Sequence, residues 1–208
     1  MATPAEITIG KLNGNWIMQR IPWLLRTALA FATLHIDIKT YETVEPETGE
    51  PATNIDFHQT TAGKLRGTTE KRTLTWKKKE HKDYFFGEVL GQSQFVGGSP
   101  DEAGHIRPEF DLQTSADDAQ EIKSFLRGGN FTESRDEVGF LCEDVKGLWV
   151  HTFERSVSAG WTAEQVMRSI WGFELINKQR HFTRRIVVMN AKGRYLCVRL
   201  VYDFEQES

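Results

Sequence analysis

The C-terminal stretch Arg180–Phe204 constrains the fold more than any other part of the sequence. Two runs rich in apolar and β-branched residues, RHFTRRIVVM and RYLCVRLVYDF, flank the short polar segment Asn190–Gly193, and this pattern predicts an antiparallel hairpin. Both faces of the second run are rich in large residues: one face carries Leu196, Val198, Leu200 and Tyr202, and the other carries Tyr195, Cys197, Arg199 and Val201. Such a sheet must be covered, and closure into a barrel covers one face without leaving an edge strand.

Shorter alternating runs precede the hairpin, and most are joined by tight turns. We expect strands within residues 7–20, 31–41, 54–62, 65–76, 83–96, 138–143, 147–156 and 164–176. Ile21–Phe31 has apolar residues at helical spacing, and so does a segment after Ser115 in the irregular insert 97–137. We therefore predict one all-β domain over residues 1–208, an up-and-down antiparallel barrel with one or two short helices. Either Ile21–Phe31 or the insert is expected to cover one mouth, unless the insert is disordered.

Charge and composition limit the partners. The formal net charge of −3 provides no basic field for nucleic acid, and no apolar run is long enough to span a membrane. Cys142 and Cys197 are too few for a disulfide framework, and the N-terminus lacks a secretory pattern, so we expect a cytoplasmic protein with reduced thiols. The basic run Trp76–Lys82 is interpreted as a solvated loop, with a phosphate or partner site as the alternative. The oligomeric state stays open.

Several kinds of chemistry have no motif in this sequence. We find no zinc-ligand spacing, no GxGxxG after a strand, no P-loop and no Gly-x-Ser-x-Gly elbow, so neither a metal nor a cofactor is predicted. A barrel instead offers a mostly apolar cavity lined by alternate residues of each strand.

The candidate cavity residues are polar and aromatic side chains on these strands. For catalysis they are Glu88, His151 and Tyr84, and for ligand binding Trp149, Trp171, Gln92, His35 and Arg185. Glu88 lies between Phe86 and Leu90, where apolar surroundings would raise the pKa of a carboxyl group. His151 alternates with aromatic residues. A shift of one residue moves either side chain to the solvated outer face, which is the alternative interpretation. The charged residues of 65–76, among them Glu70 and Arg72, are expected to be half solvated.

The sequence Gly14-Asn15-Trp16 on the first strand matches the Gly-x-Trp signature of lipocalins and their calycin relatives. This resemblance implies that Trp16 closes one end of the barrel beneath an arginine of a late strand, a cation–π contact. Arg199 is the first candidate for that arginine and Arg194 the second.

Longer segments extend the resemblance over most of the chain outside 97–137. The segments LNGNWIMQR, WLLRTALAFATLHIDIKTY, HQTTAGKLRGTTEKRTLTWKKKEHKDYFFGEVLGQSQFV and WTAEQV…WGFELIN…RHFTRRIVVMN resemble a fungal lipocalin-like family. Such proteins occur in natural-product pathways, and some act as cofactor-free cyclases or isomerases, including Diels–Alderases.

The resemblance implies a cofactor-free cyclase or isomerase acting on a hydrophobic, polyketide-derived substrate. Two alternatives use the same fold. One is a non-catalytic carrier of a fatty-acid-like or other hydrophobic ligand, and the other is a barrel filled by its own side chains that binds a partner through its surface.

Overall fold

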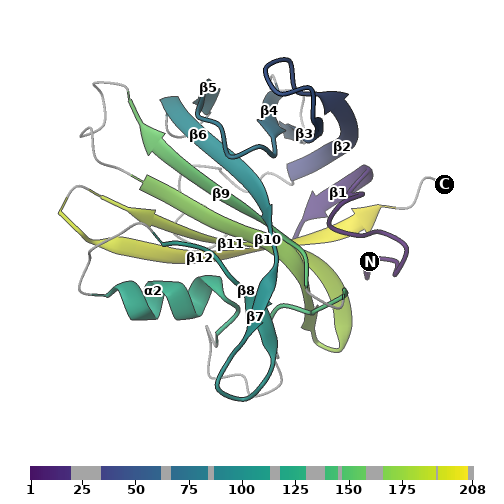
Figure 1. Ribbon diagram of the computed structural model, residues 1–208. Helices are drawn as coiled ribbons and strands as arrows, with labels where there is room; N and C mark the ends of the chain where they lie inside the picture. Colours follow the sequence, from purple (N-terminus) through teal and green to yellow (C-terminus); the bar gives the residue numbers. More distant parts are fainter. Residues whose placement is uncertain are drawn as a thin grey trace.

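A computed structural model describes residues 1–19, 34–61, 67–83, 87–112, 118–129, 139–144, 147–157, 166–190 and 192–205 of the chain. Figure 1 shows antiparallel strands curving around a common interior, with one helix beside the sheet. The strands are β1 (Gly14–Met18), β2 (Leu34–Val44), β3 (Pro51–Thr61), β4 (Thr68–Thr73), β5 (Lys79–Asp83), β6 (Gly87–Val96), β7 (Gly98–Pro100), β8 (Ile106–Pro108), β9 (Trp149–Ser156), β10 (Val166–Ile176), β11 (Gln179–Met189) and β12 (Tyr195–Glu205), and the helix is α2 (Ala119–Leu126).

Ten of these strands form one antiparallel sheet in the order β4-β3-β2-β1-β12-β11-β10-β9-β6-β5. The strands at its two ends, β4 and β5, follow each other in the chain, so the sheet curls into a nearly closed barrel. Within the described residues no backbone ladder joins β4 to β5 or β6. We call this side of the barrel the seam. The Trp76 amide, in the connection from β4 to β5, donates to the Ser93 carbonyl of β6 and ties the two sides together at 2.8 Å.

The interior of the barrel is filled by one face of each strand, since side chains alternate along a strand. Apolar side chains from β1, β2, β3, β10, β11 and β12 form its main core. Trp16 lies at 0 % exposure in this core, with the rings of Phe182 and Phe204 centred 5.3 and 5.0 Å from its own. Gly14 has a φ of +134°, and a Cβ there would lie 2.6 Å from the Phe204 ring, so a side chain at this position would displace Phe204.

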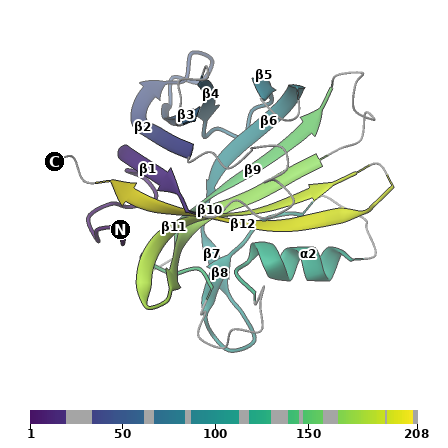
Figure 2. The ribbon, with the colours of Figure 1, turned by 180° about the vertical axis from the view of Figure 1, so that it is seen from behind.

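A second apolar layer covers the outer face of β9 to β12. Helix α2 and the small β7–β8 hairpin supply it, and Figure 2 shows both lying along that side of the sheet. Ile122 and Phe125 of α2 belong to the same cluster as Trp149, Ile170 and Val187, which are the outward residues of the wall. This part of the barrel wall is therefore buried on both faces.

The structure confirms a mostly β antiparallel barrel with a short helix, and it confirms the final hairpin between β11 and β12. The tight turn between β10 and β11 is also present, because Asn177 and Lys178 both have positive φ, as two-residue hairpin turns of this kind require. The predicted helix Ile21–Phe31 lies outside the described residues. The described part of the insert packs on the outer wall, contrary to the expectation that it covers a mouth or is disordered. No helix in the described ranges has the length and apolar character needed to cross a bilayer.

Candidate functional site

Six polar side chains from five strands meet inside the barrel beside the seam. Each occupies an inward position of its strand, so the alternation of the sheet brings them together. They are Glu70 and Arg72 of β4, His81 of β5, Ser93 of β6, Glu154 of β9 and Arg184 of β11. We call this group the inner polar cluster.

Arg72 is the centre of this cluster. Its guanidinium donates to Ser93 Oγ at 3.1 Å and to a carboxylate oxygen of Glu154, and it forms an ion pair with Glu70. Arg72 is 4 % exposed and Glu154 2 % exposed. Burial opposes the charge of Glu154, but Arg72 and His81 outweigh it and hold the pKa of this carboxyl group below its usual value. Because β4 has no ladder to β6 here, these side chains hold the seam together.

Arg184 extends the cluster toward the aromatic core. Its guanidinium lies 4.2 Å from the centroid of the Trp171 ring and 5.0 Å from that of Phe57, and its Nη1 is 3.7 Å from Glu70 Oε2. Its buried Nε has no hydrogen-bond acceptor among the described residues. Burial raises the pKa of Tyr202, against the opposite effect of Arg184, so the phenol stays neutral. A cation with a free N–H therefore lies against aromatic surface inside the barrel.

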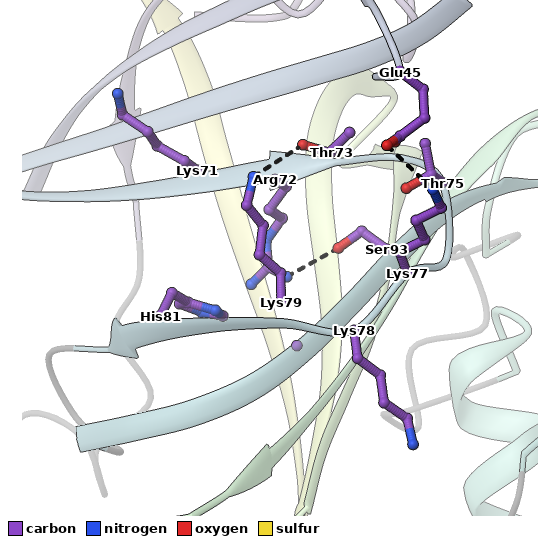
Figure 3. Close-up of a pocket in the computed structure, with 11 residues that line it drawn as sticks. Glu45, Lys71, Arg72, Thr73, Thr75, Lys77, Lys78, Lys79, His81 and Ser93 are labelled. Carbon is purple, nitrogen blue, oxygen red and sulfur yellow. Dashed lines mark hydrogen bonds and ion pairs between the residues drawn. The ribbon is translucent and has the colours of Figure 1, made fainter. Parts of the chain in front are cut away.

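A pocket of about 200 Å³ opens at the seam and reaches this cluster. Arg72, His81 and Ser93 belong both to the inner polar cluster and to the pocket lining, as Figure 3 shows. Its other lining residues come from β4, β5, β6 and the connections beside them: Glu45, Lys71, Thr73, Thr75, Lys77, Lys78, Lys79 and Gly91. The pocket thus connects the solvent at the seam to the buried charges.

Of the predicted cavity residues, the structure places Trp171 and Trp16 inside the barrel. The other predicted cavity residues in the described part of the chain lie on outward positions: His35, Glu88, Gln92, Trp149, His151 and Arg185. Their expected place in the cavity is wrong. For Trp149, His151 and Arg185 the reason is that the outer face of β9 to β11 is buried too, so both faces carry large side chains. His35, Glu88 and Gln92 lie on the solvent side of β2 and β6, which is the alternative interpretation. Tyr84 lies outside the described residues.

Glu88 is exposed, so the apolar surroundings expected to raise its pKa are missing. Its neighbour in the ladder is Lys82 of β5. Gln92 donates instead to the backbone carbonyl of Trp76 at 2.7 Å. His35 is half exposed, with Nδ1 3.4 Å from Glu205 Oε2 on the outer face.

His151 is buried on the outer face between two aromatic rings. The ring centroids of Trp76 and Phe110 lie 4.9 and 4.8 Å from that of the imidazole. Burial, helped by the charge of Arg168, lowers the pKa of His151 to about 4, against the pull of Asp111. The ring is therefore neutral at physiological pH and acts as an aromatic spacer beneath the seam connection.

Arg185 and Arg199 share a carboxylate on the outer face. Arg185 forms two hydrogen bonds with Glu174, at 2.9 and 2.8 Å, and donates to the Phe125 carbonyl at the end of α2. Arg199 Nη1 lies 3.4 Å from Glu174 Oε2. The expected stacking of Arg199 over Trp16 is thus wrong, because Arg199 alternates with Val198 and Leu200 and so points outward. Phe182 and Phe204 cover Trp16 instead.

The inner polar cluster was not predicted from the sequence. Arg72 is nearly inaccessible, contrary to the expectation of half-solvated charges on that strand. One feature of the sequence could have indicated it. Glu70 and Arg72 are two residues apart on β4 and therefore lie on the same face of that strand, and Glu154 lies on the same face of β9 as the apolar Val150. Opposite charges at inward positions of different strands indicate pairs that neutralise each other, but their pairing needs the strand register.

Comparison with known proteins supports a common origin with two fungal enzymes. The chain is 25 % identical over 217 residues to the probable pericyclase scpY of Mollisia scopiformis, covering 98 % of this chain and 94 % of that protein. It is 26 % identical over 219 residues to the pericyclase pydY of an Acremonium species, covering 98 % and 97 %. No family model and no solved structure matches. The chain is therefore a distant, full-length homologue of these pericyclases.

Proposed function

We propose that this protein is a cofactor-free pericyclase, which folds a linear unsaturated precursor inside the barrel and promotes its ring closure. The observation that carries the proposal is Arg184, whose guanidinium lies on Trp171 with a buried and unpaired Nε–H. Full-length homology to two pericyclases supports the reaction class. A location in the cytoplasm stays a prediction.

A pericyclic ring closure fits a site of this composition. In a [4+2] closure three π bonds become two σ bonds and one π bond, and no atom, proton or electron enters or leaves. The protein therefore contributes by holding the reacting carbons together in one folded conformer. It also contributes hydrogen bonds that strengthen as charge develops on a carbonyl conjugated to the reacting double bond.

The described side chains divide these two tasks. Trp171 and Phe57 provide flat apolar surface for the unsaturated chain, and Arg184 provides the donor beside them. Glu70 is 3.7 Å from Arg184 Nη1 and limits its orientation. Because the cation is already desolvated, turning toward a carbonyl oxygen costs little reorganisation.

The test is incubation of the purified protein with a linear polyene precursor, without metal or nucleotide. We expect a product ratio different from that of the protein-free control. A product profile identical to the control would refute the cyclase proposal. The remaining function would then be that of a non-catalytic carrier of a hydrophobic ligand.

Two matched variants locate the site. Arg184→Gln removes an inward arginine, whereas Arg199→Gln removes an outward arginine on the neighbouring strand. If Arg184 stabilises the transition state, its loss should lower kcat by roughly 10²–10³ while Arg199→Gln has little effect. Circular dichroism checks that both fold, and Arg184→Lys serves if the glutamine variant does not. Equal kcat in wild type and a folded Arg184 variant would refute this role.

A further inference from the structure

The seam pocket has more positive than negative charge. Five cationic side chains line it, Lys71, Arg72, Lys77, Lys78 and Lys79, together with His81 and a single carboxylate, Glu45. Four of these residues, Lys77, Lys78, Lys79 and His81, belong to the run Trp76–Lys82, for which the sequence predicts a solvated loop, with a phosphate or partner site as the alternative. The structure leaves the three lysines exposed and places them at the mouth of a pocket that leads to buried charges.

The described acidic residues neutralise only part of this charge. Arg72 is paired with Glu70 and Glu154 on the buried side. Lys77 pairs with Glu45 at 3.1 Å and with Glu47 at 2.7 Å.

Lys71 lies 3.9 Å from Asp56, at the limit of an ion pair. In the part of the chain that the structure describes, no carboxylate lies within 4.0 Å of Lys78 or Lys79.

Lys79 is the cation best placed to meet a ligand. Figure 3 shows its side chain crossing the pocket toward Thr73, whose Oγ1 is 3.4 Å from the ammonium, whereas Lys78 points away. Its ladder partner is Gly91, and the His81 ring packs directly over that glycine, since a Cβ there would lie 2.8 Å from His81 Cε1. The Lys79 ammonium, with no carboxylate within 4.0 Å among the described residues, thus lines the pocket together with Arg72 and His81.

The size of the pocket limits what it can hold. Its volume of about 200 Å³ is below the roughly 300–1,000 Å³ of sites that enclose a whole drug-sized ligand. A long precursor cannot fit there entirely, but a compact polar group at one end of it can. The ammonium of Lys79, which faces the pocket without a carboxylate partner among the described residues, favours an anionic group over a neutral one.

We propose that the seam pocket binds the anionic head group of an organic acid, with Lys79 as its main partner. This inference rests on the proposed function, because the acid is then one end of the cyclase substrate. The unsaturated part of the same molecule extends past Arg72 toward Trp171. The substrate class is therefore an acidic polyene rather than a neutral hydrocarbon.

Binding of a small probe tests the pocket without any turnover. Benzoate and benzamide have nearly the same shape, but only benzoate is charged. In ¹⁵N-labelled full-length protein, we expect benzoate to shift the amide signals of residues 77–81 and 91–93, and benzamide to leave them in place. The affinity for benzoate should fall as salt is raised, because exposed charges are screened. Equal shifts from the two probes would overturn the proposal.

Lys79→Gln is the matching variant, and Lys192→Gln at the exposed final hairpin turn is its control. We expect Lys79→Gln to weaken benzoate binding about tenfold, equivalent to about 1.4 kcal/mol, and Lys192→Gln to leave it unchanged. Unchanged binding by Lys79→Gln would overturn the assignment.

The two proposals fail in different ways. If benzoate binds as expected but no precursor is cyclised, the anion-binding proposal is supported and the cyclase proposal is refuted. If precursor is cyclised and Lys79→Gln leaves both KM and benzoate binding unchanged, the cyclase proposal is supported and the anion-binding proposal is refuted.

Discussion

Replacement of Arg72 by methionine tests whether side chains rather than a ladder hold the seam. Methionine keeps an unbranched chain of similar length and removes the charge. The change eliminates the donation to Ser93 and the ion pairs with Glu154 and Glu70, all nearly inaccessible to water. The buried carboxylate of Glu154 and the partly buried carboxylate of Glu70 then both lose the cation that they share.

The expected cost follows from the burial of this pair. Removing one partner of a buried ion pair destabilises a protein by about 3–5 kcal/mol, because the remaining charge is desolvated and uncompensated. Domains of this kind are stable by roughly 5–15 kcal/mol, so the variant should fold with a much smaller margin. A second change, Glu154→Gln, removes one of the two orphaned charges. The double variant should therefore lose less stability than the sum of the two single variants, by a coupling of about 0.5–3 kcal/mol.

The folding stability of Arg72→Met and of the wild type should depend differently on pH. In the wild type, burial raises the pKa of Glu154, but Arg72 and His81 overcome this and hold it below the unfolded value. That contribution to stability is present at neutral pH and is lost as the pH falls below about 4.5. Without Arg72 burial raises the pKa above the unfolded value, so the folded variant takes up a proton and gains relative stability as the pH falls from 7 to 5.

Urea unfolding followed by tryptophan fluorescence at pH 7 and pH 5 measures both effects. We expect a loss of several kcal/mol for Arg72→Met at pH 7 and a smaller loss at pH 5. A loss below about 1 kcal/mol at pH 7, or the same loss at both values, would refute the reasoning.

Two further predictions concern other parts of the barrel. Trp16→Ala should lower the free energy of unfolding by about 3–5 kcal/mol, since the ring is buried and its indole N–H donates to the Leu12 carbonyl at 3.1 Å; a urea midpoint close to that of the wild type would contradict it. His151 has a folded pKa of about 4 against an ordinary value of 6.5, so the unfolded chain binds its proton first and stability should fall by about 3 kcal/mol from pH 7 to pH 4. His151→Phe keeps the stacking with Trp76 and Phe110 and should remove the part of this loss between pH 6.5 and 4.5, which comparison of unfolding curves across that range would check.

The fold was largely predictable because its signal is local. Alternation in the final hairpin, the turn at Asn177–Lys178 and the order of apolar runs all depend on neighbouring residues. The position of Trp16 in the core was predictable for a different reason, the resemblance carried by Gly14-Asn15-Trp16. The arginine expected over it was not found, because the ladder places Phe204 directly opposite Trp16.

The site was harder to predict because it depends on which parity faces inward. Helix α2 and the β7–β8 hairpin bury the outer face of the wall, so Trp149 and His151 are as inaccessible as true interior residues. Sequence alternation gives no direction when both faces are buried. The pairing of Arg72 with Glu154 spans 82 positions of the chain, and only the register of the whole sheet brings them together.

The incomplete ladder at the seam has a consequence for how a long molecule can enter. Widening an ordinary closed barrel would break a row of backbone hydrogen bonds, each contributing about 0.5–1.5 kcal/mol. Here, among the described residues, separation of β4 and the connection after it from β6 breaks one backbone bond, from Trp76 to Ser93, the bond from the Gln92 side chain to the Trp76 carbonyl, and the side-chain contacts of Arg72. Lateral entry between these strands therefore leaves every ladder intact. If the proposed cyclisation takes place in the barrel, a thread-like substrate would enter sideways between these strands, and the Arg72 side chain would close the gap behind it.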